Sequence, residues 1–444
     1  MKPLDAPQRA LSFGGNPPLS LPMRYFLSAP MFAALAAAFL AWQGDAALLT
    51  RWSPLTLAIT HLLVLGCLSM TMIGAMLQML PVVAGIEVPR AEPVGAVVHL
   101  CLCAGTLALA CAFWQESPPL FRAAMALLLA GLVLFVGACT VAMWQYHLPG
   151  SGAVVAGIRL ALASLVLTMI LGGVLASVFA WPGLIQAPMQ RLTDLHALWG
   201  MLGWVGLLVI GVAFQVMPMF MLTEPYPKYL TGAYSTWLFI LLGGASLSSG
   251  WTGPGAALHM ACLVLLAAGY ALFGGTTLYL LARRKRPRAD PATLFWRTAM
   301  ASLLAATGAW LWSAAAPSGA AASAHTPLAI GVLLIVGFAL SAVSGMLYKI
   351  VPFLTWYHLQ DARSVSGRKP PNINQIIPER HAQWQYGAHL ASLLMLLAAC
   401  WQPALVRPGA ALLCAACLAL WLNLGSAVSR HVFNTFPSSL HNHE

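Results

Sequence analysis

Apolar segments of hydrocarbon length follow one another along almost the whole chain, with short polar stretches between them. A transmembrane helix needs about 20 mostly apolar residues, and twelve segments reach approximately that length. They lie at about 24–43, 54–80, 93–114, 119–143, 153–180, 194–221, 232–250, 255–282, 293–315, 325–355, 384–402 and 409–428. The pattern predicts an all-α, polytopic membrane protein with about twelve transmembrane helices.

A short phrase recurs at the end of the second, sixth and tenth segments. Its three copies are Gly74-xxx-Gln78-xx-Pro81, Gly211-xxx-Gln215-xx-Pro218 and Gly345-xxx-Lys349-xx-Pro352. Each of these segments also carries a histidine near its start: His61, His196 or His325. Recurrence at a fixed period is typical of internally repeated chains. We therefore expect one integral membrane domain over 1–444, built from three four-helix repeats at about 24–143, 153–282 and 293–428 in a pseudo-threefold arrangement.

The phrase itself is interpreted as a structural joint. Its glycine permits close approach of a second helix, and its proline punctuates the inner end of the span. A glutamine in this position can form a hydrogen bond to a neighbouring helix. Its value for the prediction is that it reveals the repeat.

The distribution of charge indicates the orientation in the membrane. Only 7% of the residues are charged and 60% are hydrophobic, and the formal net charge is +11. With the N-terminus inside, the inner loops hold most basic residues, including the run 283–288, and the outer side holds Arg51, Arg122, Arg191 and Arg407. The positive-inside rule then places the N-terminal segment 1–23 and the tail 429–444 in the cytoplasm. We expect the spans to lie in a bacterial inner membrane. We expect membrane lipids as partners and no nucleic acid.

Four histidines gather towards the outer face. His61, His196 and His325 lie near the outer ends of their spans, and His259, near the start of the eighth span, joins them. A single histidine in a span more often bonds to neighbouring backbone, whereas three at equivalent places in a repeat favour a shared site. Neutral imidazoles bind haem iron, copper and other metals. We therefore treat these four residues as candidate metal ligands.

His325 differs from the others in depth. His61 precedes the glycine of its phrase by 13 residues, His196 by 15 and His325 by 20. At 1.5 Å per residue, the extremes differ by roughly 10 Å along the helix axis. Two imidazoles on opposite faces of one haem must lie at nearly the same depth. His61 and His325 can share a haem only if the tenth span is tilted or distorted, for example near Pro327, Gly331 or Gly337.

The chain resembles the catalytic subunit of haem–copper oxidases and its relatives, which include the NnrS family. The resemblance rests on twelve spans and on outer histidines in spans 2, 6 and 10, and local likeness is best at 60–81 and 196–218. It implies that His61 and His325 hold a haem b, that His196 stands where a copper ligand stands in the oxidases, and that Arg407 pairs with a haem propionate.

The sequence also departs from the oxidase pattern. Span 7 contains no histidine, and span 10 has a single outer histidine where the oxidases have a His-x-His pair. The three-histidine copper site and the reduction of oxygen to water are therefore not expected, and copper is the less favoured metal. The His-x-His-Glu expected of NnrS proteins at the start of span 2 is also missing.

Three functional hypotheses follow. The first is a protein that binds one or two b-type haems without a covalent bond, since no Cys-xx-Cys-His is present. The resemblance implies a role in electron transfer or in nitric-oxide metabolism or tolerance, with a periplasmic electron donor or a quinol as partner. The second is a copper or metal transporter or channel that uses the outer histidines and the 19 methionines. The third is a non-catalytic subunit of a respiratory complex. Whether the chain is an enzyme, and whether it forms homo-oligomers, stays open.

Overall fold

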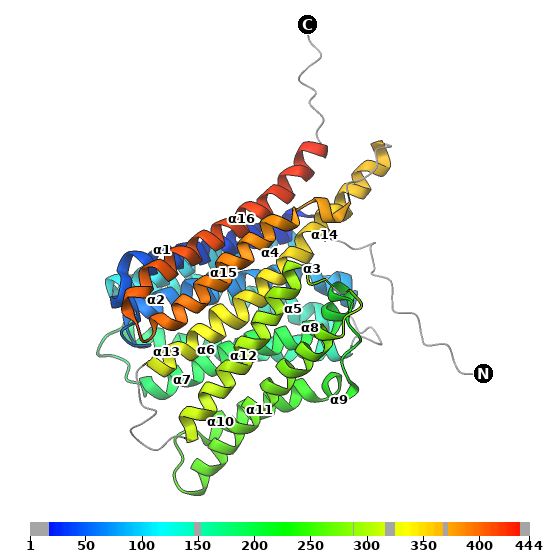
Figure 1. The fold of residues 1–444 in the computed structure, drawn as a ribbon. Coiled ribbons are helices and arrows are strands. Elements are labelled where there is room, and N and C mark those ends of the chain that lie inside the picture. The colour runs from blue at the N-terminus through cyan, green and yellow to red at the C-terminus, as the bar shows by residue number, and fades with distance from the viewer. Residues whose placement is uncertain (1–16, 146–151, 287, 316–324, 367–371, 436–444) are drawn as a thin grey trace, which may run out of the picture.

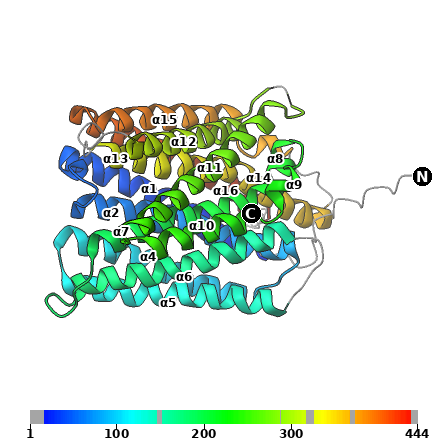
Figure 2. The same cartoon turned by 90° about the horizontal axis from the view of Figure 1, so that it is seen from below.

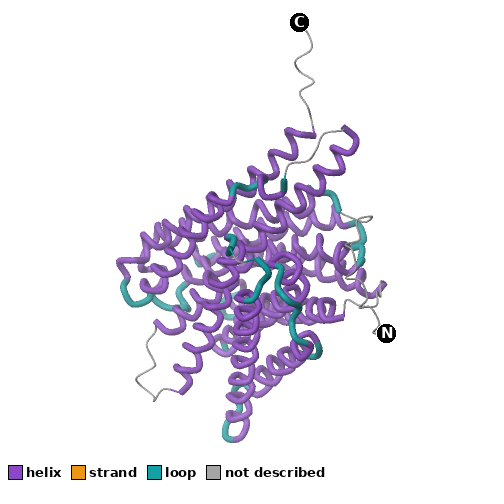
Figure 3. The backbone as a smooth tube through the Cα atoms, turned by 45° about the vertical axis from the view of Figure 1, so that its right-hand side comes forward, coloured by secondary structure: helices purple, strands orange, loops and turns teal. Residues whose placement is uncertain are grey.

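The computed structural model describes residues 17–145, 152–286, 288–315, 325–366 and 372–435. Within these ranges the chain is helical, with short loops and no strand (Figure 3). The α-helices are α1 (Ser20–Gln43), α2 (Pro54–Leu63), α3 (Met70–Met79), α4 (Ala91–Gln115), α5 (Pro118–Gln145), α6 (Gly152–Ala180), α7 (Met189–Leu198), α8 (Leu207–Met221), α9 (Lys228–Thr231), α10 (Tyr234–Ser248), α11 (Pro254–Ala282), α12 (Pro291–Ala315), α13 (His325–Val332), α14 (Ser341–Ser366), α15 (Glu379–Ala399) and α16 (Val406–Thr435).

Nine candidate membrane spans occur in the described part of the chain. They are Ser20–Leu48, Pro54–Val82, Ala91–Gln115, Pro118–Trp144, Gly152–Ala180, Met189–Met221, Pro254–Ala282, His325–Gln360 and Pro403–Ser429. Helices α10, α12 and α15 occupy the other three expected positions, but α10 has only 15 residues, and α12 and α15 are not among the nine. The all-helical character of the described residues is confirmed. The nine long apolar helices indicate a multi-pass membrane protein, and the count of twelve stays a prediction.

The three spans that carry the repeated phrase run in the same direction. Figures 1 and 2 show α2, α7 and α13 at one end of the bundle and α8 and α14 at the other. The first and last long helices, α1 and α16, pack side by side (Figure 1). This contact brings the beginning and the end of the chain together in one bundle.

Each of these three spans contains a π-helical segment in its middle. The segments are η2 (Val64–Ser69), η4 (Trp199–Gly206) and η5 (Leu333–Leu340). π-Helical turns are rare in proteins, and those that do occur are often found at functional sites. The first two segments are joined directly, because Trp204 Nε1 donates a hydrogen bond of 3.0 Å to Ser69 Oγ.

Glycines hold each of these spans against the helix that precedes it. The glycines of the phrase, Gly74, Gly211 and Gly345, lie against Tyr25 on α1, Gly157 on α6 and Phe295 on α12. A Cβ atom at Gly211 would lie 2.9 Å from the Cα atom of Gly157, so any side chain there would push the two backbones apart. The interpretation of this glycine as a close-packing joint agrees with these contacts.

A second set of glycines lies eight residues earlier. Gly66, Gly203 and Gly337 lie against Phe32, Ser164 and Ser302, seven residues after the neighbours of the first set. Two turns of an α-helix contain about seven residues, and a π-turn adds one. Each pair of glycines begins inside a π-helical segment and ends in the α-helix that follows it. The extra residue of the π-turn therefore lets eight residues on this span match seven on its partner helix.

The third copy of the phrase has Lys349 where the others have glutamine. The Lys349 ammonium forms an ion pair of 2.6 Å with Asp290 Oδ2. Asp290 also caps α12, since its Oδ1 accepts hydrogen bonds from the backbone N–H and the hydroxyl of Thr293. Burial raises the pKa of the Asp290 carboxyl, but the Lys349 charge and the Thr293 hydrogen bonds outweigh it and leave this pKa below its usual value.

Candidate functional site

A large cavity lies among the ends of the spans that carry the predicted histidines. Its volume is about 1270 Å³, larger than the 300–1,000 Å³ usual for small-ligand pockets. The three mid-span π-helical segments η2, η4 and η5 contribute to its wall, together with residues of α5, α6, α11 and α12. Its lining is mainly apolar, and the ionisable side chains among the lining residues are Arg51, His61, Arg191, Asp194, His196, His259 and Tyr270.

His61 on α2 and His196 on α7 face each other across part of this cavity. Their ring centres lie 6.2 Å apart, and the ring planes differ by 24°. His61 Nδ1 lies 2.7 Å from the carbonyl oxygen of Leu57, and His196 Nδ1 lies 3.1 Å from that of Thr168. A carbonyl oxygen only accepts hydrogen bonds, so each Nδ1 carries the proton and each neutral ring keeps a lone pair on Nε2.

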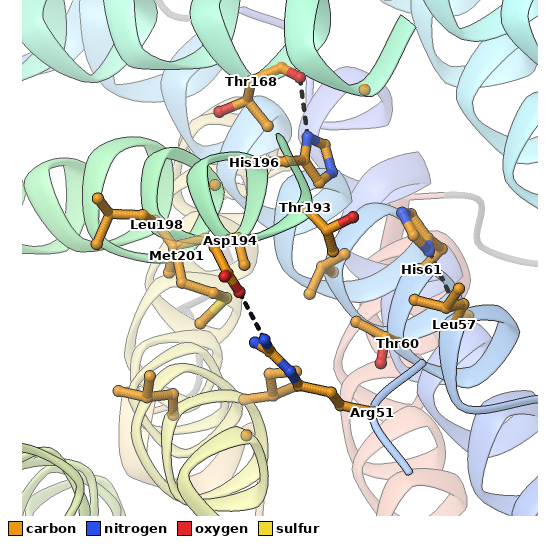
Figure 4. A pocket seen from close by; sticks show the side chains of 18 of the residues that line it. Arg51, Leu57, Thr60, His61, Thr168, Thr193, Asp194, His196, Leu198 and Met201 are labelled. Carbon is orange, nitrogen blue, oxygen red and sulfur yellow. Dashed lines mark hydrogen bonds and ion pairs between the residues drawn. The ribbon is translucent and has the colours of Figure 1, made fainter. Parts of the chain in front are cut away.

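The orientation of the two rings is shown in Figure 4. Each ring turns the nitrogen that is not bonded to a carbonyl towards the other ring. An imidazole nitrogen binds a metal at about 2.0–2.1 Å and lies about 1.1 Å from its ring centre, so a single ion between two facing imidazoles separates the ring centres by about 6.3 Å. The observed separation of 6.2 Å matches this value.

His196 is positioned by the neighbouring helix α6 as well as by its own. Its ring lies over Gly172, where a Cβ atom would come within 2.8 Å of His196 Cε1. The carbonyl of Thr168, one turn earlier on α6, accepts the hydrogen bond described above. On the other side of the pair, the ring of Phe113 lies nearly parallel to that of His61 at 5.3 Å between centres.

The other two predicted histidines are placed differently. His259 on α11 lines the same cavity, and its Nδ1 lies 2.8 Å from the carbonyl oxygen of Ala245. His325 begins α13, is exposed, and lies beside Trp401 with 6.4 Å between ring centres. It does not line the cavity. The structure therefore brings His61 together with His196 rather than with His325, and the 20-residue spacing of His325 from Gly345 is the reason.

Two arginines border the cavity, and neither is Arg407. Arg51 forms an ion pair of 2.7 Å with Asp194, and its guanidinium lies 4.2 Å from the ring centre of Trp52. Arg191 donates a hydrogen bond from Nε to Ser249 Oγ at 2.9 Å. Arg407 is exposed and packs against Gly44, outside the cavity lining. The arginines that line the cavity are therefore Arg51, which is already paired with Asp194, and Arg191.

Comparisons with known proteins do not assign a function to this site. Neither the models of known protein families nor the curated proteins gave a match to this chain. Within the described ranges, no group of three or more His, Cys, Asp or Glu side chains is arranged to hold a metal ion. The argument for a function rests on the paired imidazoles and the cavity around them.

Sequence reasoning missed the features that orient the histidines. Gly172 and Thr168 carry no recognisable motif, and the π-helical segments leave hydrophobicity unchanged. A signal for the segments does exist in the sequence, as the eight-residue spacing of Gly66 and Gly74 recurs in the other two spans.

Proposed function

We propose that this chain is a multi-pass membrane protein that binds haem b between His61 and His196 and serves in electron transfer. The observation that carries the proposal is the pair of imidazoles whose Nε2 atoms face each other at a spacing suited to one metal ion. Two protein ligands are fewer than the four of a structural zinc site and equal the two axial positions of a haem.

The surroundings of the pair fit a porphyrin. Most of the cavity wall is apolar, as the face of a macrocycle requires, and the volume of about 1270 Å³ leaves room for a large planar group. Arg51 and Arg191 border the cavity and would pair with propionate carboxylates through parallel N–H···O bonds. The Leu57 and Thr168 carbonyls fix the tautomer of both ligands and make them more basic.

Two axial imidazoles favour electron transfer over gas binding. Such a haem supplies one-electron redox chemistry and has no open coordination position. Nitric-oxide metabolism or tolerance would need one of the two histidines to leave the metal. Copper transport would need soft ligands in series along a path. Met125, Met169, Met189 and Met201 do line the cavity, but the paired imidazoles form one site among mainly apolar groups.

The same proposal includes the repeated architecture and the orientation. Three spans that each carry a π-helical segment and two glycines packed on the preceding helix support three equivalent four-helix units. The positive-inside rule supports cytoplasmic termini and a cavity near the outer face of a bacterial inner membrane.

The decisive experiment is an absorption spectrum of the protein purified from cells with full haem supply. We expect a Soret band and, in the reduced-minus-oxidised difference, the sharp bands of a six-coordinate low-spin b-type haem. Absence of a Soret band would overturn the proposal. Copper bound at one equivalent without haem would favour the transporter alternative.

A substitution at Gly172 tests the orientation of His196. In Gly172→Ala the new methyl group meets the His196 ring at 2.8 Å, so the ring must turn or shift. We expect the protein to keep its fold and most of its haem while the low-spin electron paramagnetic resonance signal shifts, because that signal reports the mutual angle of the axial imidazoles. Gly243→Ala on α10, where no atom lies within 4 Å of the added Cβ, is the matched control. An unchanged signal in Gly172→Ala would contradict the assignment of His196 as a ligand.

A further inference from the structure

The two imidazoles of the pair are held in place in different ways. His196 is held by a second helix, because the Thr168 carbonyl on α6 accepts its hydrogen bond and its ring rests on Gly172 of the same helix. The Leu57 carbonyl that bonds His61 lies one turn earlier on α2 itself. That bond moves with α2, so it fixes the tautomer of His61 but does not anchor the ring to a second helix.

The ring of Phe113 on α4 gives His61 the contact with a second helix that its hydrogen bond does not supply. The two rings lie nearly parallel, with 5.3 Å between their centres and 25° between their planes. Among the described residues, Phe113 has no ring contact with His196, so it bears on His61 from another direction. The volume filled by the phenyl ring is therefore space into which the His61 ring could otherwise turn.

Phe113 is itself fixed by two further rings. Phe121 on α5 meets it edge-on with 5.0 Å between centres, and Phe179 on α6 lies 6.1 Å away at an angle of 70°. Phe121 is buried and stacks on Phe179 with 5.1 Å between centres. Aromatic pairs at such spacings stabilise each other beyond the burial of their area. The three rings therefore form a block supported by α4, α5 and α6, against which His61 rests.

We infer that Phe113 is a positioning residue that keeps His61 turned towards the metal, and that His61 is the ligand that withdraws when this support is removed. The inference rests on the proposed function, since it assigns unequal hold to the two axial positions of the same site. When His61 withdraws, the bond between its Nε2 and the metal breaks, and a neutral diatomic gas can take the freed position without transfer of an electron or a proton. Gas binding is thus assigned to the His61 side of the pair.

The first test uses the haem-free protein. Diethyl pyrocarbonate modifies neutral imidazole nitrogens, and its rate at each histidine, measured by mass spectrometry of peptides, rises when a ring becomes free to turn. In Phe113→Ala we expect the rate at His61 to increase about tenfold, a change within the range that one aromatic pair supplies. His196 and His259, whose Nδ1 atoms are also bonded to carbonyls, should react at unchanged rates.

The second test uses the haem-loaded protein with carbon monoxide as the probe. We expect Phe113→Ala to bind the gas, and Phe113→Leu, which keeps most of the volume but loses the flat face, to bind it in a smaller fraction of the protein. Adding His196→Ala to Phe113→Ala should remove most of the haem, whereas adding His61→Ala should change little. Phe353→Ala on α14 is the matched control, because this half-buried ring also contacts two aromatic side chains, and it should not bind the gas.

Three results would overturn the inference. These are an unchanged rate of modification at His61, an equal acceleration at His61 and His196, or carbon monoxide binding by Phe353→Ala to the same extent as by Phe113→Ala. If Phe113→Ala does not fold, Phe113→Leu decides through the same two measurements. The failure of the proposed function is separate, because it would show as the absence of a Soret band in every variant, while the modification rates in the haem-free protein still decide the role of Phe113.

Discussion

A protein that carries His61→Ala and His196→Ala is expected to purify without haem. Each single variant should keep part of it, because one imidazole still binds the iron and opens the sixth position. In the proposed site the facing Nε2 atoms would supply both axial bonds, so the double variant would leave only apolar contacts and Arg51 and Arg191 to hold a non-covalent haem. The measurements are the haem-to-protein ratio and carbon monoxide binding, which should appear in the single variants and be absent in the unaltered protein.

His325→Ala is the control for this prediction. The resemblance to the oxidases implies that His325 is an axial ligand, whereas the structure places it in an exposed position beside Trp401. We therefore expect His325→Ala to keep its haem and its six-coordinate spectrum. Loss of haem in this variant, with retention in His196→Ala, would restore the pairing of His61 with His325 and exclude the geometry proposed for the site.

The positions of the helices could be predicted from the sequence because hydrocarbon thickness sets their length. Expected spans at 119–143, 153–180 and 255–282 correspond to α5 (Pro118–Gln145), α6 (Gly152–Ala180) and α11 (Pro254–Ala282). The interruption of three spans by π-helical segments could not be predicted in the same way. One extra residue in a turn leaves the hydrophobic pattern intact and shows only when the glycine spacing is compared between two packed helices.

The site was predictable in part. Recurrence in the chain singled out His61 and His196, and the two rings lie together although 135 positions separate them in the sequence. The number of residues between each histidine and the glycine of its phrase already set His325 apart, since it is 20 for His325 and 13 and 15 for His61 and His196. The carbonyls of Leu57 and Thr168 were beyond prediction, since any residue type provides a carbonyl and only the packing of α6 on α7 brings Thr168 to His196.

Lys349→Met is expected to destabilise the protein by about 2 kcal/mol at neutral pH. The substitution removes the cation from the Asp290 carboxylate while the carboxylate stays largely buried, with a side-chain exposure of 26%. Removing one partner of a fully buried pair costs 3–5 kcal/mol, and the remaining exposure lets water recover part of this. Thermal unfolding with a thiol-reactive dye measures the change, because the buried cysteines Cys67, Cys139 and Cys417 are free and react only after unfolding.

The double variant Asp290→Asn, Lys349→Gln distinguishes the effect of the unpaired charge on stability from the effect of lost packing. It restores the glutamine found in the other two copies of the phrase and keeps a residue that caps α12, so it should recover most of the lost stability. The penalty should also depend on pH. Because folding lowers the pKa of Asp290, the stabilisation by the pair is present above the unfolded value of about 3.9 and is lost as pH falls below it. A penalty for Lys349→Met that persists unchanged when Asp290 is also neutralised would show that Lys349 acts through packing, not through its ion pair.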